Sequence, residues 1–598
     1  MTKNTEKLIR MKSFKVRLLR QRRKDAKQQQ NSVRGMFGFI IALASGILMG
    51  LTVAPVGAWP LAWIALAPLW LLTSEPAKQQ NQSFCYSLAW GIGYHGLALS
   101  WITGIHPMTW MGVPWLASLA TALFCWTFIT LWGAALVASW TAGMMLANRI
   151  TQRSGWCRVL LGVALWCGLE SLWSAGPLWW TSLSYTQSPH NLAILHLGQL
   201  SGPSTVTASV VAVNGLIAEV WMNKAVVQEK LASQTSRHKN TKTQRIREQA
   251  SFWCLDVLAA LSGRYLCIAT GLLVGLHLVG FGLYSHPLIQ IPDAALKVGI
   301  IQGNVPNEIK LYPAGFRRAI EGYTTGYQAL ALQEVDAVLT PEGALPFLWR
   351  EVMRSSFYST VVEKGIVAWL GAFGEQESQR HAGVEEFEAT GVHSITNSLF
   401  TVTGDGQTFS RYNKVKLVPL GEYIPFEQFL GKSIGRLSPL NARMVAGQPS
   451  QLFDTPFGRA IASICYESAF AQHFRYQAAA GGQFILSAAN NAHYSPAMPA
   501  QHHAQDVMRA IETDRWAVRA TNTGYSGIVD PHGRTQWISQ LNAYELHAAT
   551  IYRRQTQTLY VRWGDWLTLF LLVLGGSIML YHTYKRSRKV CRQSLPPK

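Results

Sequence analysis

The chain has 598 residues, of which 49% are hydrophobic, with 23 Trp and a formal net charge of +21 at pH 7. This composition argues against a single soluble globule and favours membrane-spanning helices with basic flanks. Clustered Lys and Arg also occur in nucleic-acid-binding proteins, but no interleaving of aromatic and basic residues accompanies them here, so no nucleic-acid partner is predicted.

Apolar stretches of roughly 17–25 residues are candidates for crossing a bilayer. Eight such stretches occur, at about 36–54, 58–74, 84–105, 113–146, 157–174, 194–222, 266–284 and 563–582. Two of them are interrupted, one by Pro60 and Pro68 and the other by Gly202-Pro203. Eight spans would return both ends of the chain to the same side of the membrane.

Basic residues are concentrated in four segments: a tail at 1–34, the fourth connection with Arg149, Arg153 and Arg158, a loop at about 223–255 and a second tail at 585–598. Because Lys and Arg beside spans are retained in the cytoplasm, these segments and both termini are predicted to be cytoplasmic. Residues 35–284 would then hold membrane helices one to seven, and 563–584 the last helix. The remaining 285–562 would form a domain outside the cytoplasm.

Within 285–562 the pattern changes to short strands alternating with amphipathic helices, which predicts a mixed α/β domain. Strands are expected at 296–301, 337–340, 366–370, 397–402, 461–464, 484–487 and 517–520, and helices at about 313–333, 350–363 and 500–514.

Reactive side chains follow several of these strands. Glu342 lies between Pro341 and Gly343, where burial would raise its pKa towards neutrality and suit it as a base. Lys414 and Glu422 lie eight residues apart in a segment, 411–425, that is predicted to be extended. Cys465 is the only cysteine between Cys267 and Cys591, on the side of the membrane where an unpaired thiol is rare.

Taken singly, each residue has an ordinary explanation: a buried small hydrophobe for Cys465, a turn or cap for Glu342, and a solvated lysine for Lys414. Together, a thiol, a carboxylate and an ammonium group at successive strand ends form a coherent acyl-transfer site.

The order Pro341-Glu342, then Tyr412-Asn413-Lys414 and 419–425, then Cys465-Tyr466-Glu467, resembles the Glu-Lys-Cys arrangement of the nitrilase superfamily. More narrowly, the chain resembles the apolipoprotein N-acyltransferase family. That resemblance implies a polytopic α-helical membrane bundle of about eight spans with an extracytoplasmic nitrilase-like α/β domain, an αββα sandwich, inserted before the last span.

The resemblance also implies residue roles. Cys465 would be the nucleophile, Glu342 the general base, and Lys414 the oxyanion stabiliser together with the backbone N–H of Tyr466. Glu422 would orient Lys414 or assist proton transfer. Supporting residues would be Glu467, which follows the nucleophile, and Asn397 at a strand start.

The implied reaction passes an acyl chain from a phospholipid to Cys465 as a thioester, and then to the α-amino group of the diacylglyceryl-modified N-terminal cysteine of an apolipoprotein. The implied enzyme is a monomer without a cofactor in the bacterial inner membrane, with a periplasmic catalytic domain. His493, His502 and His503 are not expected to bind a metal, because no Cys-x-x-Cys or His-Glu-x-x-His accompanies them.

Two other functions remain open at this point. A membrane-anchored amidase would use the same residues to hydrolyse a C–N bond, and a transporter or structural protein would not need them. The chain also departs from the family pattern at Leu311-Tyr312, where an aromatic wall of the site is expected, and at Asn491-Ala492-His493-Tyr494. Glu170 and His95, inside predicted spans, are candidate lipid-headgroup contacts.

Overall fold

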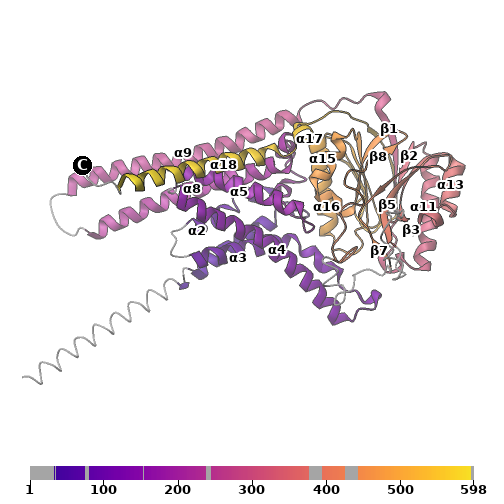
Figure 1. The fold of residues 1–598 in the computed structure, drawn as a ribbon, viewed down its shortest axis with the longest axis horizontal. Helices are drawn as coiled ribbons and strands as arrows, with labels where there is room; N and C mark the ends of the chain where they lie inside the picture. Colours follow the sequence, from indigo (N-terminus) through magenta and orange to yellow (C-terminus); the bar gives the residue numbers. More distant parts are fainter. Residues whose placement is uncertain are drawn as a thin grey trace, which may run out of the picture.

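The computed structural model describes residues 32–33, 35–74, 80–151, 154–237, 244–375, 394–424 and 442–593. A helical bundle joins an α/β domain end to end (Figure 1). Of the predicted basic tails and the loop at about 223–255, residues 1–31, 34, 238–243 and 594–598 lie outside the described ranges.

Five helices in the described ranges are long and apolar enough to cross a membrane. They are α4 (Trp115–Ile150), α5 (Gly155–Ala175), the part Pro203–Asn223 of α8 (Pro203–Arg237), the part Gly263–Tyr284 of α9 (Gln244–Tyr284) and the part Trp566–Arg588 of α18 (Trp566–Gln593). The α8 span is 78% buried and forms the centre, whereas those of α9 and α18 are only 11% buried. These two helices therefore present apolar side chains outwards, as lipid contact requires.

The other predicted spans are shorter or broken. Gly35–Gly50 is a short apolar helix, and residues 58–74 form η1 (Trp59–Trp63) and α2 (Ala67–Thr73), since Pro60 and Pro68 interrupt the helix. Residues 84–105 comprise most of α3 (Gln80–Ala98) and then η3 (Ser100–Ile105). The predicted span 194–222 begins only at Pro203, after α6 (Leu192–His196) and α7 (Gly198–Ser201).

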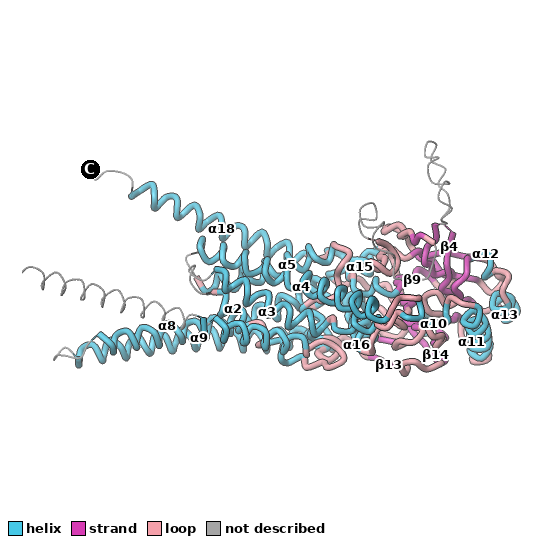
Figure 2. The backbone as a smooth tube through the Cα atoms, turned by 90° about the horizontal axis from the view of Figure 1, so that it is seen from below, coloured by secondary structure: helices cyan, strands magenta, loops and turns pink. Residues whose placement is uncertain are grey.

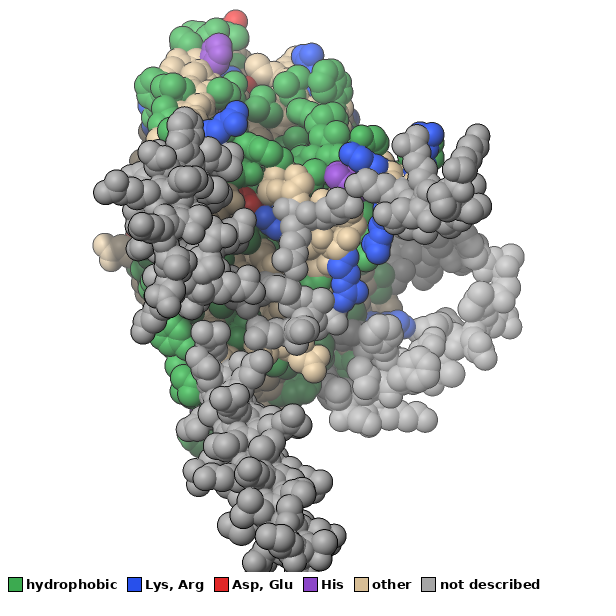
Figure 3. All heavy atoms as spheres, turned by 90° about the vertical axis from the view of Figure 1, so that its left-hand side faces the viewer, with side chains coloured by type: hydrophobic (Ala, Val, Ile, Leu, Met, Phe, Trp, Pro, Cys, Tyr) green, Lys and Arg blue, Asp and Glu red, His purple; other side chains and the backbone are tan. Residues whose placement is uncertain are grey.

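The C-terminal end of α8, the start of α9 and the C-terminal end of α18 lie at the end of the bundle away from the α/β domain (Figures 1 and 2). The start of α5 is at this end too, because Cys157 Sγ lies 3.8 Å from His582 Nε2 of α18. Figure 3 looks onto this end and shows Lys and Arg side chains at several places on it. Exposed basic residues occur at the ends of the apolar parts of these helices: Arg149 at the end of α4, Arg264 at the start of the apolar part of α9, and Lys585 near the end of α18.

Two β-sheets pack face to face in the α/β domain. The first has the order β14 (Glu545–Tyr552), β1 (Ala295–Gln302), β2 (Ala337–Leu339), β4 (Val367–Glu375), β5 (Ser394–Val402), β6 (Thr408–Asn413), with β3 (Leu345–Leu348) also paired to β4 and β7 (Arg443–Met444) to β5. The second has the order β13 (Thr535–Ile538), β12 (Gly527–Val529), β11 (Ala517–Thr521), β10 (Phe484–Ala489), β9 (Gly458–Ile464), β8 (Phe453–Thr455).

Three hydrophobic clusters separate four layers. One lies between the sheets and includes Trp369 and Leu486. A second lies under α11 (Pro313–Ala331) and α13 (Ser356–Lys364). The third lies under α15 (Ala471–Ala479) and α16 (Ala497–Thr513), the pair that faces the bundle. The predicted αββα sandwich is confirmed.

Two local predictions were wrong. The helix expected at 350–363 is split into α12 (Trp349–Val352) and α13, because the Ser355 side chain accepts from Tyr358 N (3.3 Å) and starts a new helix. The segment 411–425 is extended only as far as Asn413; beyond it the chain folds back, with Glu422 N donating to Val418 O (2.9 Å).

Candidate active site

Cys465 lies where β9 ends and the short helix η8 (Cys465–Ala469) begins. Its φ of +52° is in the left-handed region that few non-glycine residues adopt, which indicates a strained backbone at the proposed nucleophile. His502 stabilises the turn, since its Nε2 lies 2.8 Å from Cys465 O and can donate to it. The side chain is buried, and Sγ lies 3.9 Å from the main-chain O of Asn490.

Glu342 lies in the turn after β2, at the same edge of the domain. Its Oε1 accepts from Lys414 Nζ (2.9 Å) and Asn397 Nδ2 (2.7 Å), and its Oε2 accepts from Asn490 N (2.9 Å). The main chain of Asn490 therefore contacts both groups: its N–H donates to the Glu342 carboxylate, and its carbonyl oxygen faces the Cys465 thiol.

Lys414 follows β6 and is 1% exposed. Its ammonium group lies 2.9 Å from Glu342 Oε1 and 2.9 Å from Glu422 Oε1. Asn397 Nδ2 also bridges both carboxylates, at 2.7 and 3.1 Å. The folded-back segment is what makes this possible: Glu422 Oε2 accepts from Val418 N (2.8 Å), which turns the second carboxylate towards Lys414.

These contacts set the protonation states. Burial raises the pKa of the Cys465 thiol to about 12. Burial acts to raise the pKa of Glu342, but the charges of Lys414 and Lys310 and the hydrogen bonds from Lys414 and Asn397 together outweigh it. The pKa therefore lies below the ordinary 4.5, and the expectation of a near-neutral carboxyl was wrong. The two carboxylates beside Lys414 raise its pKa against the opposing effect of burial. The resting site therefore holds a thiol, a carboxylate and an ammonium ion.

Glu467 joins the nucleophile turn to the segment that carries Lys414. Its Oε2 accepts from Ile464 N (2.7 Å), and its Oε1 accepts from Val415 N (2.5 Å) and Lys416 N (3.1 Å). The side chain is fully buried. These hydrogen bonds hold the residue before Cys465 close to the two residues after Lys414, and so fix the nucleophile turn relative to the lysine.

The side chain of Tyr466 points towards the bundle. We call residues 176–188, between α5 and α6, the strap. Tyr466 Oη donates to Pro177 O (2.6 Å) and accepts from Trp179 N (3.0 Å), while its ring is stacked with that of Trp180 at a centroid distance of 6.1 Å. The residue after the proposed nucleophile is thereby attached to the membrane domain.

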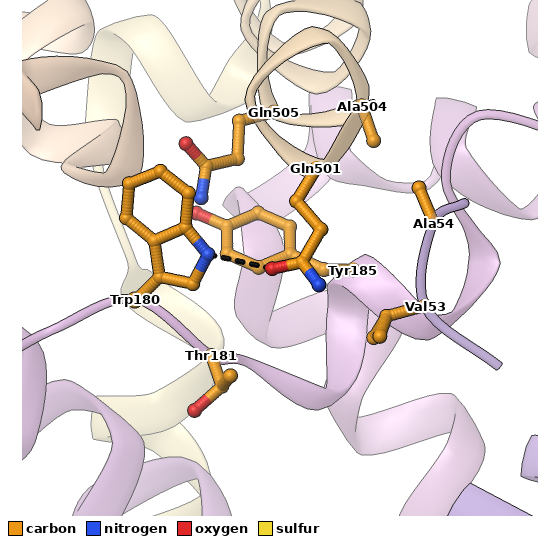
Figure 4. A pocket seen from close by; sticks show the side chains of 8 residues that line it. All are labelled: Val53, Ala54, Trp180, Thr181, Tyr185, Gln501, Ala504 and Gln505. Carbon is orange, nitrogen blue, oxygen red and sulfur yellow. Dashed lines mark hydrogen bonds between the residues drawn. The ribbon is translucent and has the colours of Figure 1, made fainter. Parts of the chain in front are cut away.

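The strap also lies against α16, and residues of both line a small pocket between them (Figure 4). Trp180 Nε1 donates to Gln501 Oε1 (2.8 Å), and Gln501 Nε2 donates to Ala98 O at the end of α3 (2.8 Å). The amide of Gln505 faces this pocket, and neither of its polar atoms has a hydrogen-bond partner among the described residues. Bundle and α/β domain thus share a hydrogen-bonded and partly apolar junction.

The two residues expected to contact lipid headgroups have internal partners instead. His95 Nδ1 lies 2.9 Å from Thr181 Oγ1 of the strap. Glu170 is 8% exposed and points inwards, where four donors satisfy it. They are Trp166 Nε1 (3.1 Å), Ser182 Oγ (2.7 Å), Leu183 N (2.8 Å) and Thr207 Oγ1 (2.9 Å).

The departures from the family pattern also have structural outcomes. Tyr312 is 42% exposed, so it forms no buried wall. His493 is stacked with Trp110 from the α3–α4 connection, at a centroid distance of 6.1 Å, and Tyr494 contacts Trp101 edge-on at 4.9 Å. This loop therefore contacts the bundle.

Three site residues were not predicted from the sequence: Asn490, His502 and Lys310. Asn490 acts through its backbone, which residue identity does not reveal. His502 was considered only as a metal ligand, and the described residues contain no group of three or more His, Cys, Asp or Glu that could hold a metal ion. Lys310 is 6% exposed and donates to the main-chain O of Glu342 (3.0 Å). The sequence signal that could have identified Lys310 was its position a few residues after the end of β1.

Fold and site together define a membrane-embedded protein with a nitrilase-like catalytic domain. The family description "Carbon-nitrogen hydrolase" matches residues 333–559, and "Apolipoprotein N-acyltransferase N-terminal domain" matches residues 45–216. The apolipoprotein N-acyltransferase of Nostoc sp. is 58% identical over 539 residues, covering 89% of this chain and 98% of the relative. That of Synechocystis sp. is 45% identical, with the same coverage of both chains, 89% and 98%.

The chain belongs to the apolipoprotein N-acyltransferase family. With its apolar helices and bacterial relatives, it is a bacterial membrane protein.

Proposed function

We propose that this enzyme transfers a fatty acyl chain from a phospholipid, through a thioester on Cys465, to the α-amino group of the N-terminal diacylglyceryl-cysteine of apolipoproteins. The observation that carries this proposal is the convergence of the Cys465 thiol and the Glu342 carboxylate at Asn490, with Lys414 bonded to the carboxylate, in a chain of this family. Glu342 is the general base, Cys465 the nucleophile and Lys414 the oxyanion stabiliser.

In the first half-reaction the Cys465 thiol gives its proton to Glu342, and the sulfur attacks the carbonyl carbon of the phospholipid ester. The negative charge that develops on the carbonyl oxygen is stabilised by Lys414 and the backbone N–H of Tyr466. The C–O bond then breaks. The leaving alkoxide takes the proton from Glu342 and departs as a lysophospholipid, leaving the acyl group on sulfur.

In the second half-reaction the neutral α-amino group of the acceptor attacks the thioester carbonyl. Glu342 accepts a proton from the attacking nitrogen, and the C–S bond breaks to release the sulfur. That proton returns to sulfur, which regenerates the thiol and the carboxylate. Glu422 and Asn397 keep Lys414 and Glu342 in register through both steps, and Glu467 holds the two chain segments together.

We further propose that the bundle lies in the bacterial inner membrane, with the α/β domain in the periplasm and both termini in the cytoplasm, and that the enzyme acts as a monomer. The exposed basic residues at the end of the bundle opposite the α/β domain support this orientation. The strap contacts of Tyr466 hold the site close to the membrane, where a phospholipid and a lipid-anchored acceptor can both reach it.

The test is transfer to a defined acceptor. Purified full-length chain in detergent is incubated with a phospholipid and a synthetic diacylglyceryl-cysteine peptide, and the peptide is analysed by mass spectrometry. We expect an added acyl chain on the α-nitrogen, and none with Cys465→Ser or with an acceptor whose amine is already acetylated. Release of free fatty acid with an unmodified peptide would instead favour the amidase-like alternative, in which water is the acceptor.

A further inference from the structure

The charge balance around Glu342 depends on a second lysine. Glu342 and Glu422 both contact Lys414, so two buried carboxylates share one ammonium group. With only these groups, the cluster would carry a net negative charge in a buried site, and one carboxylate would tend to take up a proton. Lys310 supplies the second positive charge. Its Nζ lies 3.0 Å from Glu342 O, and the charges of Glu342 and Cys465 act to raise its pKa against the larger effect of burial.

Local packing fixes Lys310 over the turn that carries the base. It ends the helix α10 (Asn307–Lys310), against which the first turn of α11 packs so closely that a Cβ on Gly315 would lie 2.7 Å from Lys310 Cα. Its Nζ donates to Glu342 O at 3.0 Å. Gly343, the residue after Glu342, has a positive φ of +53°. A Cβ atom at this position would lie 3.6 Å from Lys310 Nζ, so the ammonium group lies directly against the turn.

The contacts of the two lysines differ. Lys414 lies 2.9 Å from each of two carboxylates, whereas no carboxylate of a described residue lies within 4.0 Å of Lys310 Nζ. Among the described residues, the only side-chain hydrogen bond of Lys310 goes to a neutral carbonyl. An ammonium group in this position acts on Glu342 through its charge and through the backbone of the turn.

Other titratable groups facing Glu342 do not supply this charge. Burial holds the pKa of His493 at about 4, which keeps its ring neutral at physiological pH, and burial raises the pKa of Tyr494. The charged and titratable groups around Glu342 are Lys310 on α10, Lys414 after β6, Glu422 in the following loop, Cys465 on η8, and His493 and Tyr494 after β10. Burial lowers the pKa of Lys310 to about 8, so Lys310 is charged throughout the acidic range in which Glu342 titrates.

We propose that Lys310 is a positioning residue for acyl transfer: its hydrogen bond fixes the turn that carries Glu342, and its charge keeps the Glu342 carboxylate ionised until the Cys465 proton arrives. The inference rests on the proposed function, since it takes Glu342 to be the base.

The test compares pH profiles of thioester formation on Cys465, using full-length protein in detergent with phosphatidylethanolamine micelles as donor. Lys310→Gln keeps a donor but removes the charge, Lys310→Met removes both, and Lys310→Arg keeps the charge. The matched control is Lys297→Gln, because Lys297 Nζ also donates to a main-chain carbonyl, that of Gln333 (2.5 Å), but on β1 away from the site.

We expect the acid limb of the profile to move up by about one pH unit in the Gln and Met variants, because Glu342 loses a stabilising cation. The Arg and Lys297→Gln variants should keep the limb of the unmodified chain. An unchanged limb in both uncharged variants, even with a uniformly lower rate, would overturn the proposal and leave Lys310 a purely structural role.

A second readout needs no turnover. The carboxyl stretch of protonated Glu342, identified in infrared spectra by its absence from Glu342→Gln, should appear at higher pH in Lys310→Gln than in the unmodified chain. An identical titration in both would contradict the proposal even if no acyl-enzyme formed. Failure of the unmodified chain to form a thioester, with a shifted infrared titration, would instead count against the proposed function alone.

Discussion

Two buried carboxylates on either side of the domain junction are stabilised in opposite ways. Glu342, in the α/β domain, is paired with Lys414 and lies near Lys310. Glu170, in the bundle, has no Lys, Arg or His within 4.0 Å among the described residues and is satisfied by four neutral donors. Cations and neutral donors both stabilise an ionised carboxylate, but only a cation also balances its charge. We expect Glu342 to act in the chemistry and Glu170 to hold the strap.

The largest expected effect is on catalysis. Glu342→Gln should lower the rate of thioester formation by about 10²–10⁴, since a positioned general base contributes that much. Lys414 keeps its contact with Glu422 in this variant, so the fold should be retained. The measurement is the rate of acylation of Cys465 alongside thermal unfolding of the same preparation. A rate close to that of the unmodified chain would end the assignment of Glu342 as the base.

Glu170→Leu should show the reverse pattern. Removing the acceptor of four buried donors should lower the free energy of unfolding by about 3–5 kcal/mol, because each unsatisfied buried donor costs roughly 1–3 kcal/mol and some will find new partners. Protein that stays folded should lose less than about tenfold in acylation rate, an indirect effect through the strap.

The control for this variant is Thr130→Val in α4, whose buried hydroxyl has no hydrogen-bond partner in the part of the chain that the structure describes and should be dispensable. Thermal unfolding in detergent compares the two. If Glu170→Leu kept its stability but abolished acylation, the contrast between the two carboxylates would be lost.

A smaller effect is expected from Tyr466→Phe. The variant keeps the stacking on Trp180 but loses the hydrogen bonds to Pro177 O and Trp179 N, worth about 1–2 kcal/mol together. If the strap contact orients the nucleophile turn, kcat should fall several-fold, with little change in KM for the donor. Tyr544→Phe, which loses a bond to Gly322 O elsewhere in the domain, should leave kcat unchanged. Equal effects of both variants would argue against a role for the strap.

The smallest expected change is in pH dependence. The pKa of Glu342 is lowered below 4.5, so the base is ionised above that pH. The rate of thioester formation should therefore fall only when the pH drops through this lowered pKa. Between about pH 5 and 7 the rate should vary little, because the thiol, with a pKa of about 12, stays protonated. An acid limb near pH 6–7 would indicate that burial dominates over Lys414.

Much of this arrangement could be predicted from local sequence. The positions of Glu342 and Cys465 at the ends of predicted strands indicated that both are site residues. The Tyr412-Asn413-Lys414 motif identified Lys414 as the cation. The pKa of Glu342 could not be predicted, because its direction depends on groups distant in the sequence, Lys414, Lys310 and Asn397, which together outweigh burial. Lys310 was missed for the same reason. Its proposed role depends on its hydrogen bond to the carbonyl of Glu342, which follows β2 and is distant in the sequence.

The bundle was harder to predict in detail. Hydropathy located the apolar stretches, and Pro60 and Pro68 already indicated an interruption in one of them. Hydropathy alone did not show that this stretch forms two short helices. It also suggested lipid for Glu170, because a carboxylate in an apolar helix looks unpartnered until Ser182 and Thr207 are brought to it by the fold. The orientation in the membrane, the residue roles and the monomeric state stay predictions.

The central claim is that Cys465 carries the acyl group. The most direct measurement is peptide mass spectrometry of the full-length chain after incubation with phospholipid, followed by hydroxylamine, which cleaves thioesters. We expect a hydroxylamine-labile acyl adduct on Cys465 that disappears when a diacylglyceryl-cysteine peptide is added. A folded protein with an intact, unmodified thiol under these conditions would contradict it.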